Sequence, residues 1–215
     1  MAQQERALQT RRQLVEAAAS VFAERGYDGA STGEILTRAG FTRGAMYHHF
    51  ASKEAIAQEV VAAQIEALRP PTTSVRLQAA IDITLTYARL LQTSDVLRAA
   101  VRLTVEETSF SQSRTAPYQW ALDVVENVLR EADAGGELLP GTPIPDLAQL
   151  IVGSFTGIQL LSNLVSGRDD LLHRVSLMWD LLLPGIAVPG VLRRLDTHEE
   201  RGHLLGGTQG DADAV

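Results

Sequence analysis

Apolar residues recur at helical spacing along nearly the whole sequence, and this periodicity restricts the chain to an all-α fold. Leu14, Ala18 and Phe22, for example, share one stripe of a helix predicted over about 7–25. Gly26 follows, and glycine favours a helix end because it adopts the left-handed conformation easily. No alternation of Val, Ile and Thr reaches the length of a strand. The sequence therefore predicts a helical protein without a sheet.

Glycines, prolines and capping residues divide this pattern into elements. Ser31 and Glu34 fit a capping box at the start of a short helix that closes at Gly40. Thr42 is a plausible N-cap for a third helix ending near His49. The other helices are expected over about 52–68, 75–92, 95–107, 117–134, 146–166, 169–183 and 190–196. The predicted architecture is a small three-helix bundle, a connecting helix and a larger bundle.

We divide the chain accordingly. Residues 1–52 are expected to form a helix-turn-helix domain, and residues 53–204 a helical ligand-binding and dimerisation domain. The first helix of the second domain, 53–69, connects the two, and a Pro-Pro-Thr-Thr-Ser break follows at 70–74. Residues 205–215 have almost nothing to bury and are expected to be a disordered tail.

Composition excludes several classes of protein. The chain has no cysteine, which excludes disulfides and sulfur-based zinc sites. The start of the chain lacks the apolar core of a signal peptide, and no uninterrupted apolar run reaches membrane-spanning length. We therefore expect a cytoplasmic protein without a membrane partner, cofactor or metal. The net charge is −7, but residues 1–55 hold seven Lys and Arg against six Asp and Glu. Only that first part could offer a surface to phosphates.

The segment FTRGAMYHHF, residues 41–50, has the features of a DNA-reading helix. In a helix-turn-helix the first residues of the second helix face base edges in the major groove. Arg43 lies at that start, Gly44 is small enough for close approach, and Tyr47 lies one turn on. A helix-turn-helix without DNA function remains the alternative. His48 and His49 are a poor metal pair because neighbours on a helix point about 100° apart.

Residues 10–56 also resemble the DNA-binding domain of the TetR family of repressors. Phe22, Gly26-Tyr27, Ala39-Gly40, Thr42, Gly44, Tyr47, Phe50 and Lys53 carry the resemblance, whereas Phe41, Arg43 and Met46 depart from the commonest residues. The resemblance implies double-stranded operator DNA as a partner. The expected DNA-binding residues are Arg11, Thr32, Thr42, Arg43, Gly44, Ala45, Tyr47, His48, His49 and Lys53, the only lysine.

Later stretches resemble the γ-butyrolactone autoregulator receptors of streptomycetes, one branch of that family. They are VLRAAVRLTVEE at 96–107, GELLP at 136–140, VGSFTGIQLLSN at 152–163 and LLPGIAVPGVLRRLDTHEERG at 182–202. The branch implies a lactone-type effector and a tryptophan in the pocket, where Trp120 stands. The expected ligand-binding residues are Gln64, Tyr87, Trp120, Val124, Val152, Phe155, Thr156 and Gln159. Polar groups such as Gln64, Thr156 and Gln159 could instead bond across helices.

The resemblance further implies a homodimer, for which the apolar surfaces of helices 146–166 and 169–183 are suited. An effector that displaces the helix starting at Lys53 would change the spacing of the two recognition helices and release DNA. Two alternatives stay open: a repressor that senses an antibiotic or another metabolite, and a ligand-independent DNA-binding regulator. We expect no enzyme, because Walker, HExxH and nucleophile-elbow motifs are all missing.

Overall fold

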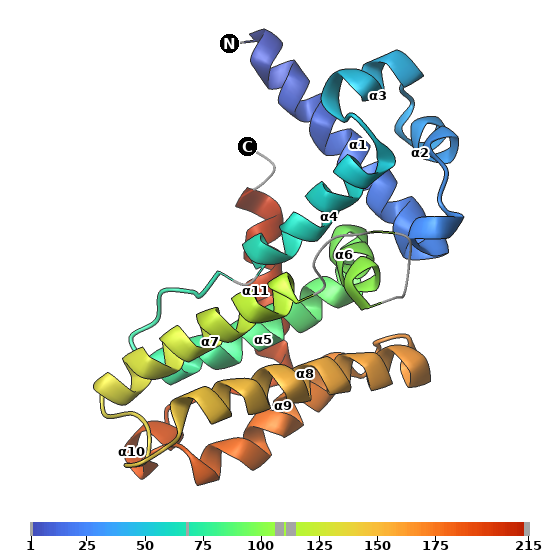
Figure 1. Ribbon diagram of the computed structural model, residues 1–215. Coiled ribbons are helices and arrows are strands. Elements are labelled where there is room, and N and C mark those ends of the chain that lie inside the picture. The colour runs from blue at the N-terminus through green and yellow to red at the C-terminus, as the bar shows by residue number, and fades with distance from the viewer. Residues whose placement is uncertain (1, 68, 106–109, 111–114, 213–215) are drawn as a thin grey trace. The chain divides into compact units, whose positions relative to one another are not determined.

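The computed structural model describes residues 2–67, 69–105, 110 and 115–212 of the 215-residue chain. These residues are predominantly helical, and among them Leu138 and Ala187 form an isolated β-bridge but no strand is present. The helices are α1 (Ala2–Gly29), α2 (Thr32–Ala39), α3 (Arg43–His49), α4 (Lys53–Ala67), α5 (Arg76–Thr93), α6 (Asp95–Val105), α7 (Ala116–Ala134), α8 (Ile144–Ser166), α9 (Leu171–Leu182), the 3-10 turn η1 (Leu183–Gly185), α10 (Pro189–Leu192) and α11 (Glu199–Ala212) (Figure 1). The all-α prediction is confirmed.

The chain folds into two compact units. Unit 1 contains α1–α4 and α6, and unit 2 contains α5 and α7–α11. The division proposed from the sequence at residue 52 was drawn by function, and it separates α4 and α6 from the helices with which they pack. The reason is apolar burial: Val60 of α4 and Leu103 of α6 belong to the same core as α1.

The core of unit 1 is built from buried apolar side chains of all five of its helices. Leu14 and Phe22 of α1, Ile35 of α2, Met46 of α3 and Ile56 of α4 are all completely buried. Each such side chain removed from water contributes about 1.5–3 kcal/mol. The helical stripe predicted over α1 is therefore the face that holds the short helices in place.

Helix ends in unit 1 follow the predicted capping chemistry in part. Gly26 (φ 69°) interrupts α1, and Gly40 (φ 72°) closes α2, both in conformations that glycine adopts easily. The Ser31 hydroxyl accepts a hydrogen bond from the Glu34 amide at 3.1 Å. The Glu34 carboxylate instead pairs with Arg25 at 2.6 Å, so the predicted capping box is realised by its serine half.

α6 is tied to α1 within unit 1. The Arg102 guanidinium donates to the Ala23 carbonyl at 2.8 Å. Phe110, after α6, lies 5.1 Å from the Tyr27 ring, which is itself stacked on Phe22. The contact between Arg102 and Ala23 lies just before the interruption of α1 at Gly26.

Unit 2 is organised around α5, whose residues from Leu77 to Ala88 are all buried. The Trp179 indole of α9 donates to the Thr84 hydroxyl at 2.8 Å. At the start of α5 the Glu137 carboxylate accepts from the Arg76 and Leu77 amides at 2.9 and 2.7 Å. A carboxylate at a helix start satisfies free amides and the helix dipole together. α5 is therefore held at its start and along its length.

α8 and α9 lie side by side and leave an apolar surface on unit 2 (Figure 1). Its members are the large exposed apolar residues Leu150, Leu161, Leu164, Val165, Leu177 and Leu181, which we call the α8/α9 face. α8 is long and apolar enough to cross a membrane by length and composition alone. Only 22% of its most apolar 18-residue window is buried inside the structure. Gln149, Thr156, Gln159 and Ser162 interrupt it, so the sequence contains no continuous apolar run there.

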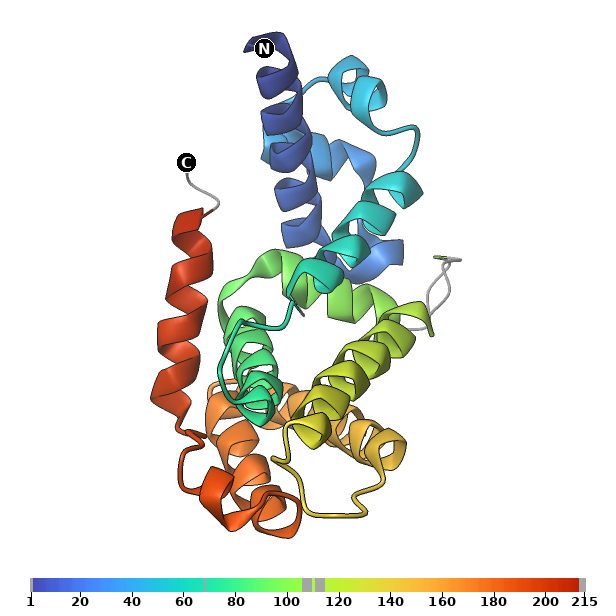
Figure 2. The same ribbon diagram turned by 90° about the vertical axis from the view of Figure 1, so that its left-hand side faces the viewer.

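The end of the described chain differs from the sequence-based expectation. A disordered tail was expected from residue 205, but α11 runs from Glu199 to Ala212, beside α5 (Figure 2). Gly202 explains how the helix is anchored, because a Cβ there would lie 2.6 Å from the Leu172 side chain and 3.3 Å from the Leu85 carbonyl. The backbone of α11 thus approaches α5 and α9 closely, and the helix continues beyond that point. Residues 213–215 lie outside the described part.

Candidate nucleic-acid interface and effector site

The turn between α2 and α3 sets the position of the candidate DNA-reading helix. The Phe41 amide donates to the Leu36 carbonyl across Gly40, and the Thr42 hydroxyl accepts from the Ala45 amide at 3.3 Å. Thr42 therefore works as the N-cap that its sequence position predicts. Around Gly44 the nearest group to an added Cβ would be the Thr42 hydroxyl, 4.0 Å away, so this point of α3 is open to an incoming surface.

α3 has one buried and one exposed side. Met46 and Phe50 face the core of unit 1, as predicted. Arg43, Tyr47 and His48 are exposed, and 49% of the surface of Tyr47 is accessible to solvent. The Arg43 guanidinium lies 6.0 Å from the centre of the Tyr47 ring, so the cation and the phenol occupy neighbouring positions on that exposed side. A helix fixed by its apolar side can present this polar side to a groove.

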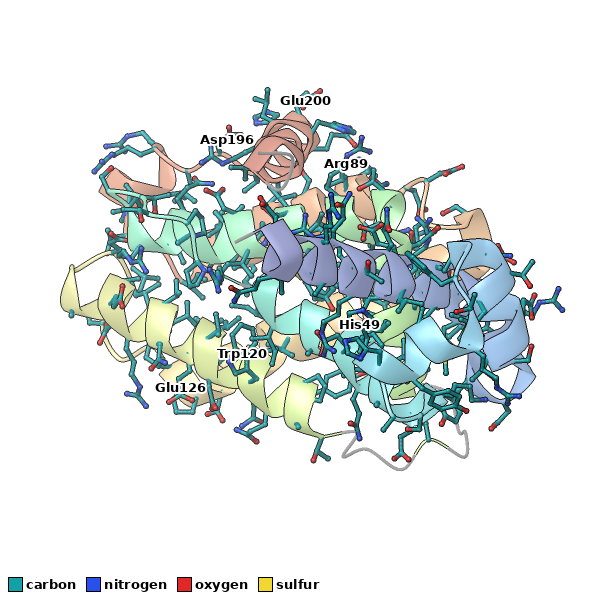
Figure 3. The ribbon with its side chains drawn as sticks, turned by 90° about the horizontal axis from the view of Figure 1, so that it is seen from above. His49, Arg89, Trp120, Glu126, Asp196 and Glu200 are labelled. Carbon is teal, nitrogen blue, oxygen red and sulfur yellow. The ribbon has the colours of Figure 1, made fainter. Side chains whose placement is uncertain are left out.

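The side chains of His48 and His49 contact each other. Their rings are 5.2 Å apart and nearly perpendicular. Among the described residues no group of three His, Cys, Asp or Glu side chains is arranged to hold a metal ion. His49, labelled in Figure 3, is at the end of α3. Its carbonyl accepts a hydrogen bond from Arg11.

Arg11 has its contacts inside unit 1. Its guanidinium makes a two-point contact with the Glu59 carboxylate at 3.1 and 2.7 Å, and it lies 4.2 Å from the centre of the Phe50 ring. Together with the bond to the His49 carbonyl, one side chain joins α1, α3 and α4. Arg11 thus links three helices of unit 1, and the direct DNA contact expected of it from the sequence stays a prediction.

Lys53 is also engaged within the unit. Its ammonium donates to the Tyr27 and Ala30 carbonyls at 2.8 and 3.0 Å and lies 4.1 Å from the centre of the Tyr27 ring. Two of its three donors thus bond to one carbonyl in the last turn of α1 and to one just after it. Thr32, the first residue of α2, and Ala45 on α3 are partly exposed. Of the predicted DNA-binding set, Arg43, Gly44, Tyr47 and His48 lie on the open side of α3.

Part of the predicted ligand-binding set comes together in unit 2. The Tyr87 ring of α5 and the Phe155 ring of α8 meet edge to face, with centres 5.6 Å apart. Burial raises the pKa of Tyr87, so its phenol is protonated and can donate at neutral pH. Gln159, one turn beyond Phe155, is buried and its carbonyl oxygen accepts from Arg168 at 3.3 Å.

The remaining members contribute less specific contacts. Thr156 donates back to the Val152 carbonyl at 2.8 Å, a local helix bond that occupies its hydroxyl proton. Trp120 and Val124 are half-buried on α7, and Val152 is half-buried on α8. Figure 3 shows Trp120 on α7 and Asp196 beside α11, on opposite sides of unit 2. The backbone of Gln64 lies in α4, but its side chain lies outside the described residues.

Two aromatic or cationic neighbours of this cluster were not singled out from the sequence. Tyr118 is half-buried on α7, and its burial raises its pKa. Arg168 is buried in the turn after α8. Neither lies in a recognisable motif, and Arg168 falls in a Ser-Gly-Arg break that reads from sequence as a loop. Only the packing of the turn against Gln159 reveals it.

Comparison with known proteins settles the family. The family model described as bacterial regulatory proteins, tetR family, matches residues 14–60, and the tetracyclin repressor-like C-terminal domain matches residues 74–189. The chain belongs to the TetR family. Its resemblance to that family, stated on residues 10–56, is thereby confirmed. TetR regulators bind operator DNA, dimerise and bind small-molecule ligands, and as transcriptional regulators they are not enzymes.

Individual relatives of this TetR-family protein point to one branch. It is 41% identical over 197 residues to the A-factor receptor protein of Streptomyces griseus, covering 91% of this chain and 70% of that one. Its fold is similar to full-length TylP, a TetR regulator from Streptomyces fradiae (TM-score 0.84, 44% identity, 94% and 98% of the two chains). A γ-butyrolactone receptor, an ArpA-like protein, is similar over 94% and 98% (TM-score 0.71, 25% identity). The resemblance to the autoregulator receptors is confirmed.

Proposed function

We propose that this protein represses transcription as a homodimer on operator DNA and releases the operator when a γ-butyrolactone- or butenolide-type effector binds unit 2. The proposal rests above all on α3, whose apolar side is locked in the core while Arg43 and Tyr47 stand exposed beside each other. The similarity to the γ-butyrolactone receptor, an ArpA-like protein, supports the choice of effector class. A repressor of this kind works in the cytoplasm.

For DNA binding, we assign different tasks to the exposed and the engaged cations. Arg43 at the start of α3 can reach a phosphate or a guanine edge, and the Tyr47 hydroxyl can reach a phosphate. Gly44 allows the backbone to come close. Arg11 fixes the end of α3, and Lys53 fixes the end of α1, through hydrogen bonds to backbone carbonyls inside unit 1. His48 is exposed beside Tyr47 and can add a weaker phosphate contact.

For dimerisation, we assign the α8/α9 face. Contiguous exposed leucine side chains on two adjacent helices mark a protein interface more often than a free surface. Two copies of a helix pair form a four-helix interface under two-fold symmetry. The same pairing accounts for the apolar character of α8 without a membrane. Other apolar residues of the same two helices are buried within unit 2, namely Leu147, Ile151, Leu172, Val175 and Trp179.

For effector binding, we assign the cluster of Tyr87, Phe155 and Gln159, with Trp120 and Val124 contributing apolar surface from α7. Chain connectivity offers the route to the DNA-binding helices. α5 ends at Thr93 and α6 begins at Asp95, so a single residue joins a helix of unit 2 to a helix of unit 1. A shift at the end of α5 therefore passes into α6, which is bonded to α1 through Arg102.

The test is a mobility-shift assay with DNA flanking the gene for this protein, titrated with γ-butyrolactones and butenolides. Retardation that a lactone reverses is the expected result. Retardation that only an unrelated metabolite reverses would replace the effector class, and retardation that nothing reverses would favour a ligand-independent regulator. If the wild-type protein retards none of this DNA, operator binding itself is contradicted.

A further inference from the structure

Arg168 has an unusual backbone conformation for its residue type. Its φ is 76°, and among the described residues it is the only non-glycine with positive φ. It follows Gly167 at the end of α8, and its amide donates to the Ser162 carbonyl at 3.1 Å. The Gln92 amide of α5 holds the Arg168 carbonyl at 2.8 Å. A strained conformation kept at a charged residue is a reason to look for function at that residue.

The side chain of Arg168 is buried, with 9% of the residue exposed. Its guanidinium donates to the Gln159 carbonyl oxygen at 3.3 Å, and Gln159 is only 3% exposed. Its positive charge also acts on Tyr87, where it opposes the rise in pKa that burial causes. Arg168 therefore belongs to the same cluster as Tyr87, Phe155 and Gln159.

The polar groups of this cluster share one chemical property. A guanidinium has donors and no acceptor. Gln159 uses its oxygen to accept from Arg168, which leaves its amide NH2 as the group it can offer. The Tyr87 phenol is protonated at neutral pH. A cluster of donor groups beside the Phe155 ring suits a ligand whose polar end carries acceptor oxygens.

We propose that Arg168 is a specificity-determining ligand residue, whose guanidinium donates a hydrogen bond to the carbonyl oxygen of the effector. This inference rests on the effector class of the proposed function. Gln159 orients the guanidinium, and the turn at 167–168 places it at the end of α8. A lactone or butenolide ring supplies the acceptor, whereas the corresponding cyclic ether keeps the ring and loses the carbonyl.

A competing explanation is that Arg168 serves packing alone, since a cation at a helix C-terminus is stabilising. Two variants separate the explanations. Arg168→Gly removes the guanidinium and suits the positive φ, so it relieves backbone strain while abolishing the donor. Arg168→Lys keeps the charge and the strain but loses the planar fork of donors. Arg130→Gln, which removes an exposed α7 arginine paired with Glu126, is the matched control.

The experiment uses the full chain and measures three quantities: melting temperature, operator affinity without effector, and lactone affinity by thermal shift and operator release. A γ-butyrolactone is compared with its carbonyl-free cyclic ether. We expect Arg168→Gly to weaken lactone affinity by about tenfold or more, as for loss of a hydrogen bond to a charged group. Ether affinity, operator affinity and melting temperature should stay near those of the wild type and of Arg130→Gln.

Four outcomes would overturn the inference. Arg168→Gly could bind lactone as the wild type does, or it could lose lactone and ether equally together with melting temperature, which would make Arg168 a packing residue. Arg168→Lys could restore lactone affinity fully, in which case charge alone would be sufficient and the assigned donor geometry would be wrong. A wild-type protein that binds no lactone in either assay would instead remove the proposed effector class, and this inference with it.

Discussion

Arg201 of α11 and Asp82 of α5 form a two-point ion pair inside unit 2, with Nη2 and Oδ2 2.8 Å apart and Nε donating to Oδ1. The Asp82 side chain is completely buried. Gln78 joins the same network, donating to Asp82 at 2.7 Å and to the Asp196 carbonyl at 2.9 Å. The network lies beside the close approach of Gly202 to Leu85, so α11 is bonded to α5 by charge and by packing together.

Arg201→Met is expected to destabilise the protein strongly. It leaves the Asp82 carboxylate buried without its cation, and breaking one side of a buried pair typically costs about 3–5 kcal/mol. Chemical denaturation measures the loss, and the double variant Asp82→Asn with Arg201→Met should recover part of it. An Arg201→Met protein as stable as Arg130→Gln would show that the ion pair with Asp82 contributes nothing to the stability of unit 2.

Arg43→Gln is expected to weaken operator binding without changing stability, because Arg43 is exposed and its closest ring contact is with Tyr47. If Arg43 contacts a phosphate, the slope of log affinity against log salt should fall by about one. If it contacts a guanine edge, discrimination against a changed base pair should fall by about 1–3 kcal/mol. Titrations at several salt concentrations separate the two, and unchanged affinity and specificity would exclude Arg43 from the interface.

Lys53→Met is expected to lower stability and to leave the phosphate contacts with DNA unchanged. It removes two hydrogen bonds to the Tyr27 and Ala30 carbonyls and the contact with the Tyr27 ring, so the melting temperature should fall. Hydrogen bonds to charged groups make a net contribution to stability of about 1.5–3 kcal/mol each. The salt dependence of the DNA affinity that remains should match the wild type. A normal melting temperature with a reduced salt slope would restore the phosphate contact expected from the sequence.

Asp170 gives unit 2 an acid-sensitive ion pair. Hydrogen bonds from Ser162, Ser166 and Arg174 hold the pKa of its carboxyl well below the usual 3.8. A depressed folded pKa contributes stability above the unfolded pKa, and this contribution is lost as pH falls below about 4. Asp170→Asn should therefore be less stable at neutral pH and lose less stability on acidification. Denaturation between pH 7 and 3 checks this, with Asp133→Asn on α7 as the exposed control; parallel curves for Asp170→Asn and wild type would refute it.

Leu164→Glu is expected to produce a monomer. Leu164 is 79% exposed in the α8/α9 face, and a carboxylate there would be buried without a partner if two copies met through that face. Its effect on the stability of the single chain should be small. Sedimentation velocity reports the mass, and Leu204→Glu on α11, exposed outside that face, is the control. A dimer of unchanged affinity would place the interface elsewhere.

Sequence periodicity predicted most of the fold because each short helix carries its own capping signal and apolar stripe. The start of α3 after Thr42 and the burial of Met46 and Phe50 both follow from local rules. The membership of α6 in unit 1 does not, since it depends on Arg102 and Leu103 meeting α1, about 80 positions earlier in the chain. Long-range contacts of this kind leave no trace in local spacing.

The candidate site was predictable to a similar degree. Arg43 and Tyr47 lie where helical geometry predicts them. The tertiary partners of Arg11 and Lys53 could not be predicted, because a cation looks the same in sequence whether it contacts a phosphate or a carbonyl. Arg168 was missed for the opposite reason. It stands in a glycine-marked break, where surface exposure is the normal expectation, yet the turn folds its side chain inward against Gln159.

The most direct test of the account is reciprocity between effector and operator. Isothermal titration of one γ-butyrolactone, into the free protein and into the protein saturated with operator DNA, measures both lactone affinities. The account predicts weaker lactone binding in the presence of operator, by the same factor by which lactone weakens operator binding, about 5- to 150-fold for typical coupling. Equal lactone affinities with and without operator would contradict it, because a ligand that does not distinguish the two states cannot release DNA.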